Sequence, residues 1–517
     1  MNLLTDKHLP VATTNGDLCH VNIPFLFGLL SENRVLDLPF LRPHQRAPWH
    51  SFCVQLAALA LHRGGHDKVV TDAATWRELL RRLTADWPED EPWRLIVEGL
   101  TKPAFMQPPV SGGSGDPHRT PVGSTDDLDV LVTAKNHGVK QGIGTDASPA
   151  AWVAALVLLQ TTGGFLGAGN YGIARMNGGF ATRPWIGLVP PGGLGAHWRR
   201  DVTVLLRRRD WFYERVEAFA EAHGKALLWC LPWDGVRSLG FEELDPWFIE
   251  ICRRVRLYRD EAGTITAKSV GSSAARIAAK SYKGNVGDPW IPIDLDKDSA
   301  AYNTAPSYRV MSGVLFDRNR WLRPLLLDWH EGIDEIPMTA RFDVIVRGQG
   351  TTEGHHLREV RFEERHVRLF QSDEGRDRLA KISKDMIEEA ATLRNKVLKI
   401  PLLTLIQAGD AAVDFRDKMA SAWAQPWLDQ VDQAIEPIFF DHLFARAEQG
   451  RPADQAWVLF LKRTAKQIFE RAVAAVPIAG ARRLKAIAVA EEKLGGLFFA
   501  SFEGYLVTPA EEAADVG

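Results

Sequence analysis

Apolar residues in the last third of the chain recur with a helical period. They step by three and four residues, as one face of a helix requires: Leu379, Ile382, Met386, Ala390, Leu393 and Val397. Similar patterns cover residues 415–427, 430–447, 454–476 and 481–499. Pro401, Pro426, residues 450–452 and Pro477 interrupt these patterns, and proline ends or kinks a helix. Helices joined by short loops predict an antiparallel four-helix bundle over residues 371–517.

The first 370 residues mix both periods. Residues 50–62, 75–83 and 150–160 have helical patterns, and residues 185–189 resemble a strand. Apolar and polar residues alternate over 341–347 and again over 357–370, which predicts a β-hairpin with residues 350–354 at its tip. The tip is too long for a two-residue turn and should protrude. The predicted fold class is therefore α+β, with a mixed domain over 1–370 and the helical bundle over 371–517.

A glycine-rich stretch runs from residue 161 to residue 187. Polar residues, among them Asn170, Arg175 and Arg183, stand between its glycines, which include Gly163, Gly164, Gly167, Gly169 and Gly172. Glycine adopts positive φ easily and lets a backbone approach another surface closely. The stretch therefore predicts a loop whose main chain lies against something polar or anionic.

Composition limits the possible ligands. The chain has 517 residues, 45% hydrophobic and 25% charged, with a formal net charge of −3, which is ordinary for a globular protein. Nucleic-acid binding would therefore need a local basic face. Candidate faces are the window 253–288, with Lys268, Lys280 and Lys283, and the last two predicted helices, with Lys462, Arg463, Lys466, Arg482 and Arg483. A run of charge is also typical of a solvated face.

Residues 135–144 form a further candidate. Lys135, Asn136, His137 and Lys140 alternate there with small residues, which fits either a solvated connector or a loop that contacts phosphate. The four cysteines are far apart and form no CxxC, which argues against a zinc ribbon and favours reduced thiols in the cytoplasm. The sequence has no signal peptide, and its longest apolar run, 150–159, is too short to cross a bilayer.

Residues 167–172 match GxGxxG, the dinucleotide-binding motif. That motif needs a strand before it, a helix after it and an acidic residue about twenty positions later. A helical pattern precedes this one, and no acidic residue lies between Asp146 and Asp201. A nucleotide-dependent enzyme is therefore the weaker alternative, and no cofactor is predicted.

Two clusters resemble metal sites only in part. Glu353, His355, His356 and His366 lie near the hairpin, but adjacent strand residues point to opposite faces. Residues 294–298 contain three aspartates but lack the glycine and closing glutamate of a calcium loop. We predict neither a metal site nor a catalytic residue, because no nucleophile, Walker or HExxH motif is present.

A bare glycine backbone with nearby cations suits a phosphate-lined groove. The narrow minor groove of DNA admits such a backbone or one long lysine more easily than a helix, and readout there has low sequence specificity. The predicted hairpin could act beside it as a wedge that opens the duplex.

The whole chain resembles the CasA family, the large subunit of the type I-E CRISPR surveillance complex called Cascade. The shared features, in order, are the MNLL start, QLAALAL, PAFMQ, the loop from Lys135, the glycine loop, DPW-x-P at 288–292, the hairpin that ends in ERH, and the C-terminal helices. The cysteine cluster of some members is missing here. The resemblance implies a non-enzymatic subunit that recognises the protospacer-adjacent motif (PAM) from the minor groove.

Residue roles implied by this resemblance fall on the loops. The glycine loop would be Gly163 to Gly172, and the lysine finger would be Lys280, with Lys268 or Lys283 as alternatives. The wedge would comprise Thr351, Thr352, Glu353, Gly354 and His355.

The resemblance also implies partners. The loop 135–144 would contact the guide RNA and a neighbouring Cascade subunit. The bundle would support the displaced DNA strand during R-loop formation and help recruit the helicase–nuclease for antiviral defence. A third interpretation is a purely structural assembly subunit.

Overall fold

The computed structural model describes residues 1–112, 115–131, 148–176, 182–216, 219–220, 223–300, 302–334, 337–348, 353–409 and 412–506. The chain divides into two compact units. The first comprises Met1–Pro306 and Asn319–Val367, and the second Ser307–Arg318 and Arg368–Gly517. The α+β class predicted from the sequence is confirmed. Within the described ranges, no helix is both long and apolar enough to cross a membrane.

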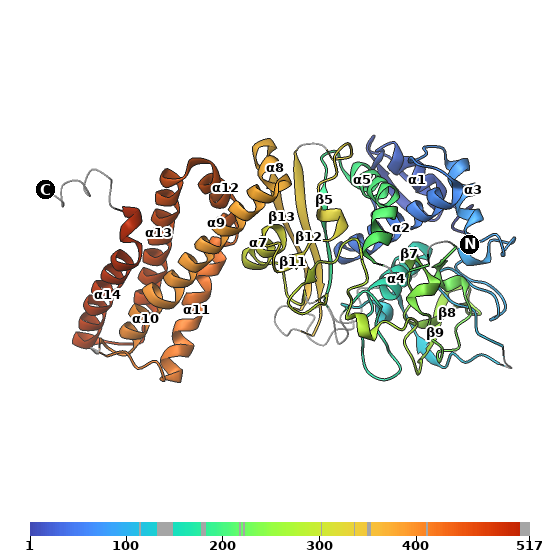
Figure 1. The fold of residues 1–517 in the computed structure, drawn as a ribbon. Coiled ribbons are helices and arrows are strands. Elements are labelled where there is room, and N and C mark those ends of the chain that lie inside the picture. Colours follow the sequence, from blue (N-terminus) through green and yellow to red (C-terminus); the bar gives the residue numbers. More distant parts are fainter. Residues whose placement is uncertain are drawn as a thin grey trace. The chain divides into compact units, whose positions relative to one another are not determined.

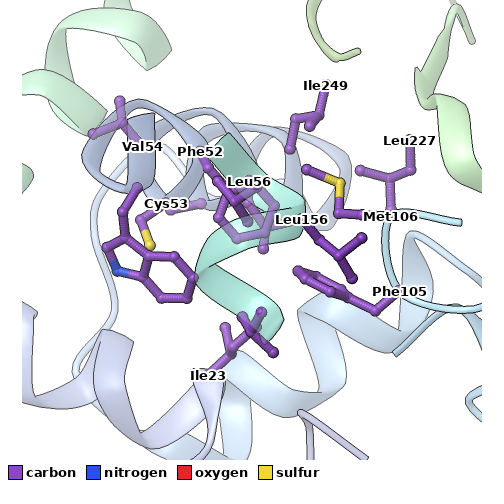
Figure 2. Packing of buried hydrophobic residues seen from close by; sticks show 14 of the residues in the cluster. Ile23, Phe52, Cys53, Val54, Leu56, Phe105, Met106, Leu156, Leu227 and Ile249 are labelled. Carbon is purple, nitrogen blue, oxygen red and sulfur yellow. The ribbon is translucent and has the colours of Figure 1, made fainter. Parts of the chain in front are cut away.

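Two almost wholly apolar helices form the centre of the first unit. Phe52, Cys53 and Leu56 on α2 (Arg46–Gly64) pack near Leu156 on α4 (Pro149–Thr162), together with Phe105 and other buried side chains (Figure 2). A helix that is apolar on all sides must be buried on all sides. The other helices of this unit are α1 (Ile23–Ser31), α3 (Ala73–Arg82), α5 (Leu194–Arg207) and α6 (Arg209–Arg215) (Figure 1).

The described strands of this unit form five small sheets. Their strand orders are β2-β1-β3, β4-β9-β8, β6-β7, β10-β11 and β13-β12-β5. Among the described strand pairs, β6 and β7 are parallel and the others are antiparallel. The strands outside the hairpin sheet are β1 (Leu9–Thr13), β2 (Leu18–Val21), β3 (Val35–Asp37), β4 (Thr120–Val122), β6 (Lys225–Leu227), β7 (Leu244–Ile249), β8 (Arg254–Arg259), β9 (Ile265–Val270), β10 (Ile293–Asp294) and β11 (Trp321–Leu322).

The predicted hairpin is present. Strands β12 (Met338–Val346) and β13 (Gly354–Phe362) pair antiparallel, and β12 also pairs with β5 (Arg183–Val189) (Figure 1). The prediction of a strand through residue 370 is wrong, because residues 364–371 form helix α8 (Glu364–Gln371). Val367 and Phe370 are both buried, and this spacing of three is helical.

All described secondary-structure elements of the second unit are helices. Its elements are α7 (Tyr308–Phe316), α9 (Asp373–Thr392), a π-helical segment (Leu393–Leu398), α10 (Lys399–Ile406), α11 (Lys418–Ile435), α12 (Phe439–Gln449), α13 (Arg451–Ala475) and α14 (Gly480–Leu506). Helix α7 joins this unit from the middle of the chain, which the sequence did not indicate.

Two proline predictions for this unit are corrected. Pro426 lies inside α11, where Ala424, Leu428 and Val431 are buried on either side of it, so packing keeps the helix continuous despite the lost hydrogen bond. The helix does not end at Pro401, because the π-helical segment Leu393–Leu398 leads directly into α10, which contains this proline.

Candidate nucleic-acid interface

The glycine loop begins at the end of α4, where Gln160 fixes it to the segment between β7 and β8. The Gln160 amide donates to the carbonyls of Met106 (2.9 Å) and Arg253 (3.0 Å). Its oxygen accepts from the backbone N–H of Cys252 and of Arg253, each at 2.9 Å. All four hydrogen-bonding sites of a buried amide are thus used, so the base of the loop has one conformation.

The Arg253 side chain ties the two sides of the loop together. Its guanidinium donates to the Gly164 carbonyl at 2.7 Å and also to the Tyr171 carbonyl. The N–H of Ile173 donates to the Gly163 carbonyl at 2.9 Å. The loop is therefore a narrow, closed projection with a fixed base.

Gly167, Ala168 and Gly169 form the tip. The tip turn is closed by hydrogen bonds from Asn170 N–H to the Gly167 carbonyl (3.0 Å) and from Leu166 N–H to the Asn170 carbonyl (2.9 Å). Within the described part of the chain, the N–H groups of the three tip residues have no hydrogen-bond acceptor. Consecutive free amides on a projecting turn can bind an acceptor such as a phosphate oxygen or a base edge.

The loop glycines have two separate roles. A Cβ on Gly163 would lie 2.8 Å from the Cys252 sulfur, and one on Gly172 would lie 2.8 Å from the Phe165 nitrogen. These two glycines therefore allow neighbouring atoms to pack closely against the loop. Gly167 has φ +106° and an added Cβ there would meet nothing within 4 Å, and Gly169 has φ +89°. Both positions favour glycine through their positive φ, but only Gly167 is open, because Gly169 lies against the backbone of Gly271 and Ser272.

The arginines of the glycine stretch face inward. Arg175 donates to the Phe248 carbonyl at 2.7 Å and lies 3.5 Å from Asp288, while Arg183 donates to Asp288 at 3.0 Å. Both are buried. Their guanidinium groups therefore neutralise a carboxylate of the DPW segment inside the fold.

Glu250 lies behind the loop. Its Oε1 accepts from the N–H of Ala174 at 2.6 Å. Burial raises the pKa of Glu250 to about 7, although the charge of Arg175 and the Ala174 hydrogen bond oppose this shift. The loop is thus anchored by a carboxyl group that titrates near neutral pH.

Of the three candidate lysines, Lys268 has the clearest structural connection to the loop tip. It lies on β9, three residues before Gly271, and the N–H of Ser272 donates to the Gly169 carbonyl at 3.1 Å. Its ammonium lies 5.3 Å from the centroid of the Tyr258 ring. Lys280 and Lys283 flank the exposed 3₁₀ turn η6 (Lys280–Tyr282), and neither has a described contact with the loop.

The predicted wedge lies partly outside the described residues, since Thr351 and Thr352 are not described. Glu353 is partly exposed, and Gly354 begins β13 with φ +150°. His355 is a strand residue whose Nε2 lies 2.9 Å from Asp343 Oδ1. Its imidazole is engaged with β12 rather than exposed at the tip.

The remaining candidates lie partly outside and partly within the described residues. Lys135, Asn136, His137 and Lys140 lie outside the described residues. Lys462, Arg463 and Lys466 are exposed on α13. On α14, Arg482 is exposed, whereas Arg483 donates to the Val473 carbonyl at 3.0 Å.

The dinucleotide alternative fails on the order of elements. Helix α4 leads into the GxGxxG residues, and a turn at Ala174 and Arg175 follows them. A dinucleotide fold needs a strand that leads into the loop and a helix whose N-terminus holds the pyrophosphate. The described residues provide neither.

One polar cluster has no counterpart among the sites predicted from the sequence. His50 on α2 and His197 on α5 meet at the carboxylate of Asp201, beside a cavity of about 410 Å³. Burial and the neighbouring His50 lower the pKa of His197 to about 4. Burial alone would raise the pKa of Asp201. The charges and hydrogen bonds of the two histidines have the larger effect and hold the pKa of Asp201 well below its usual range. His197 and Asp201 are four apart on one helix, but nothing in the sequence links them to His50.

No protein-family model matches the chain, and no curated protein sequence matches it. The structure nevertheless matches solved structures over nearly its whole length. Thermobifida fusca Cse1 matches with TM-score 0.65 and 15% identity, over 97% of this chain and 98% of that chain. Thermus thermophilus CasA (Cse1) matches with TM-score 0.60 and 16% identity, over 97% and 99%.

A chain of a CRISPR RNA-guided surveillance complex matches with TM-score 0.58 and 13% identity, over 96% of this chain and 99% of that chain. At these identities the similarity concerns the fold. This chain has the Cse1/CasA fold from end to end, in agreement with the resemblance noted in the sequence.

Proposed function

We propose that this chain is the large, CasA-type subunit of a type I-E CRISPR surveillance complex, working in the cytoplasm. The observation that carries the proposal is the fold correspondence over 96–97% of the chain with a Cse1 protein and with a chain of an RNA-guided surveillance complex. Its partners are then a guide RNA, other Cascade subunits, double-stranded target DNA and a helicase–nuclease. It has no catalytic role of its own.

We further propose that the glycine loop tip reads the PAM from the minor groove. The N–H groups of Gly167, Ala168 and Gly169 have no acceptor among the described residues, and they stand on a base held by Gln160 and Arg253, which supports this role. A rigid tip loses little entropy on binding, and amide donors match the acceptors that every base pair presents in the minor groove. The guide RNA reads the rest of the target by base pairing.

Lys268 is the best-supported lysine finger. It reaches the surface from β9, and at about 3.3 Å per strand residue its Cα lies about 10 Å along the chain from Gly271, which adjoins Gly169. The sequence alone favoured Lys280. The support for Lys268 is its place in the chain, three residues before Gly271, because the described contacts of the loop tip are with Gly271 and Ser272.

A native pull-down tests the assembly. The tagged chain, expressed in its own cells, should recover a small RNA and a protein present in several copies. Recovery of the chain alone, or of proteins without RNA, would exclude a role in an RNA-guided complex.

Two lysine variants test the DNA-binding role. In the assembled complex, Lys268→Ala should weaken binding to a PAM-containing duplex about tenfold, because the attraction between the ammonium and the DNA is lost. For the same reason, the salt dependence of binding should decrease. Lys280→Ala, an equally exposed control, should change affinity less than twofold. The opposite ranking would assign the finger to Lys280. Unchanged affinity in both variants would favour a purely structural subunit.

A further inference from the structure

A histidine pair and a carboxylate meet at a point that the DNA-binding proposal does not use. His50 Nε2 lies 2.8 Å from Asp201 Oδ2, and His197 Nε2 lies 3.3 Å from the same oxygen. The three possible ligand atoms all lie within 4.8 Å of one another. Ligands that share one first-row ion at about 2.0–2.2 Å are separated by about 3 Å, so the two histidine–carboxylate distances already fit, and the imidazoles would need to reorient.

The carboxylate is held in place from behind. Arg200 donates to Asp201 Oδ1 at 3.1 Å, so Oδ2 is the oxygen that remains for an ion. Arg200 is itself fixed by Asp334, at 2.7 and 3.1 Å, and by the Leu326 carbonyl at 2.7 Å. Outer partners of this kind orient a metal ligand before the ion arrives.

The cavity provides access. Both imidazoles line it and Asp201 does not, so the carboxylate closes the buried side and an ion enters past the rings. The two rings are stacked, with centroids 4.0 Å apart and an angle of 17°. An ion must lie in the plane of each ring it binds, so binding would rotate the imidazoles apart, and the adjoining cavity has room for this movement.

We propose that His50, His197 and Asp201 bind a divalent first-row transition-metal ion, with zinc as the probe, and that the ion links α2 to α5. Two imidazole nitrogens and one carboxylate oxygen suit zinc and its neighbours better than calcium or magnesium, which prefer all-oxygen sites. From the sequence we expected no metal, because the candidate histidines lay elsewhere. This inference does not depend on DNA binding.

Zinc titration of the chelator-treated full-length chain tests the proposal. Calorimetry should show one equivalent bound, and the melting temperature should rise with zinc concentration because the ion binds only the folded state. His50→Ala and His197→Ala should each weaken binding at least tenfold. His355→Ala, which removes another imidazole lining the same cavity, should bind within twofold of the parent. Absence of a stoichiometric site, or parental affinity in both cluster variants, would overturn the proposal.

The spectrum of cobalt(II) gives a second readout on the unsubstituted protein, which matters if a variant fails to fold. One equivalent of cobalt should give visible d–d bands of a nitrogen and oxygen site, and zinc should abolish them. A spectrum identical to aqueous cobalt would overturn the proposal.

Discussion

Gly172 and Gly167 belong to the same loop but have different surroundings. A Cβ on Gly172 would collide with backbone atoms, at 2.8 Å from the Phe165 nitrogen, whereas a Cβ on Gly167 would meet nothing within 4 Å. We predict that Gly172→Ala lowers the free energy of unfolding by about 2–3 kcal/mol, as overpacking does. Gly167→Ala should lower it by about 1 kcal/mol through positive φ alone. Urea unfolding of the two variants measures both, and equal losses would contradict the packing role.

Glu250 predicts a pH dependence. Its pKa is about 7 in the folded chain against an ordinary value of 4.5, so the folded state holds a proton that the unfolded state releases. Stability from this group is therefore present below about pH 4.5 and is lost as pH rises towards 7. Glu250→Gln keeps the acceptor for Ala174 N–H and cannot ionise. The variant should match the parent at about pH 4 and exceed it by up to about 3 kcal/mol at pH 8, since one pKa unit is worth about 1.4 kcal/mol.

Denaturant unfolding at the two pH values measures this difference. A variant that is less stable than the parent at pH 8 would show that the Glu250 charge, paired with Arg175, stabilises the fold.

Residue type alone did not distinguish the polar side chains that are buried from those that face solvent. Arg175 and Arg183 stand between glycines as a phosphate-binding arginine would, yet both neutralise the buried Asp288. Their partner lies more than a hundred positions later in the chain, so no local pattern indicates the pairing. The positive-φ glycines at the tip, by contrast, follow from glycine density, because turns need them.

Among elements, one side chain makes most of the described hydrogen bonds between α4 and the β7–β8 segment. Gln160 makes four hydrogen bonds to backbone groups. Gln160→Leu should lower the free energy of unfolding by at least about 2 kcal/mol, because each orphaned buried group costs about 1–3 kcal/mol.

Gln55 on α2 gives the matched control. It is also buried but makes a single hydrogen bond, to the Phe248 carbonyl at 3.2 Å. Gln55→Leu should therefore cost clearly less than Gln160→Leu in the same unfolding measurement. Equal costs would mean that Gln160 does not fix the loop base.

Periodicity predicted most elements and misjudged their ends. The apolar spacing located α2, α3, α4, α9, α11, α12, α13 and α14, and the alternation located β12 and β13. It failed at α8, where a run that reads as alternating is buried at helical spacing, and at Pro426, where packing outweighs the lost hydrogen bond. These failures share a cause, since tertiary burial decides between local alternatives.

At the scale of the molecule, the order of motifs along the chain indicated the Cse1/CasA fold, which structural similarity then confirmed. What the sequence could not supply is the meeting of distant residues. The loop tip meets the segment after β9 through the hydrogen bond from Ser272 N–H to the Gly169 carbonyl. His50 meets Asp201 only because α2 packs on α5. The transfer of residues 307–318 to the second unit likewise has no local signal.

One pair of glycines tests the proposal that the loop tip enters the minor groove. Gly167 (φ +106°) and Gly263 (φ +83°) both have positive φ, and a Cβ added to either would meet nothing within 4 Å. Gly263 lies in the turn between β8 and β9, at the end of β9 away from Gly271. Leucine at either position therefore has a similar conformational cost, and only Gly167→Leu adds bulk to the tip.

The measurement is the affinity of the assembled, guide-RNA-loaded complex for a duplex that carries the PAM, at physiological salt. We predict that Gly167→Leu weakens binding at least tenfold, whereas Gly263→Leu stays within twofold of the parent. Equal affinities for the two variants would contradict entry of the tip into the groove.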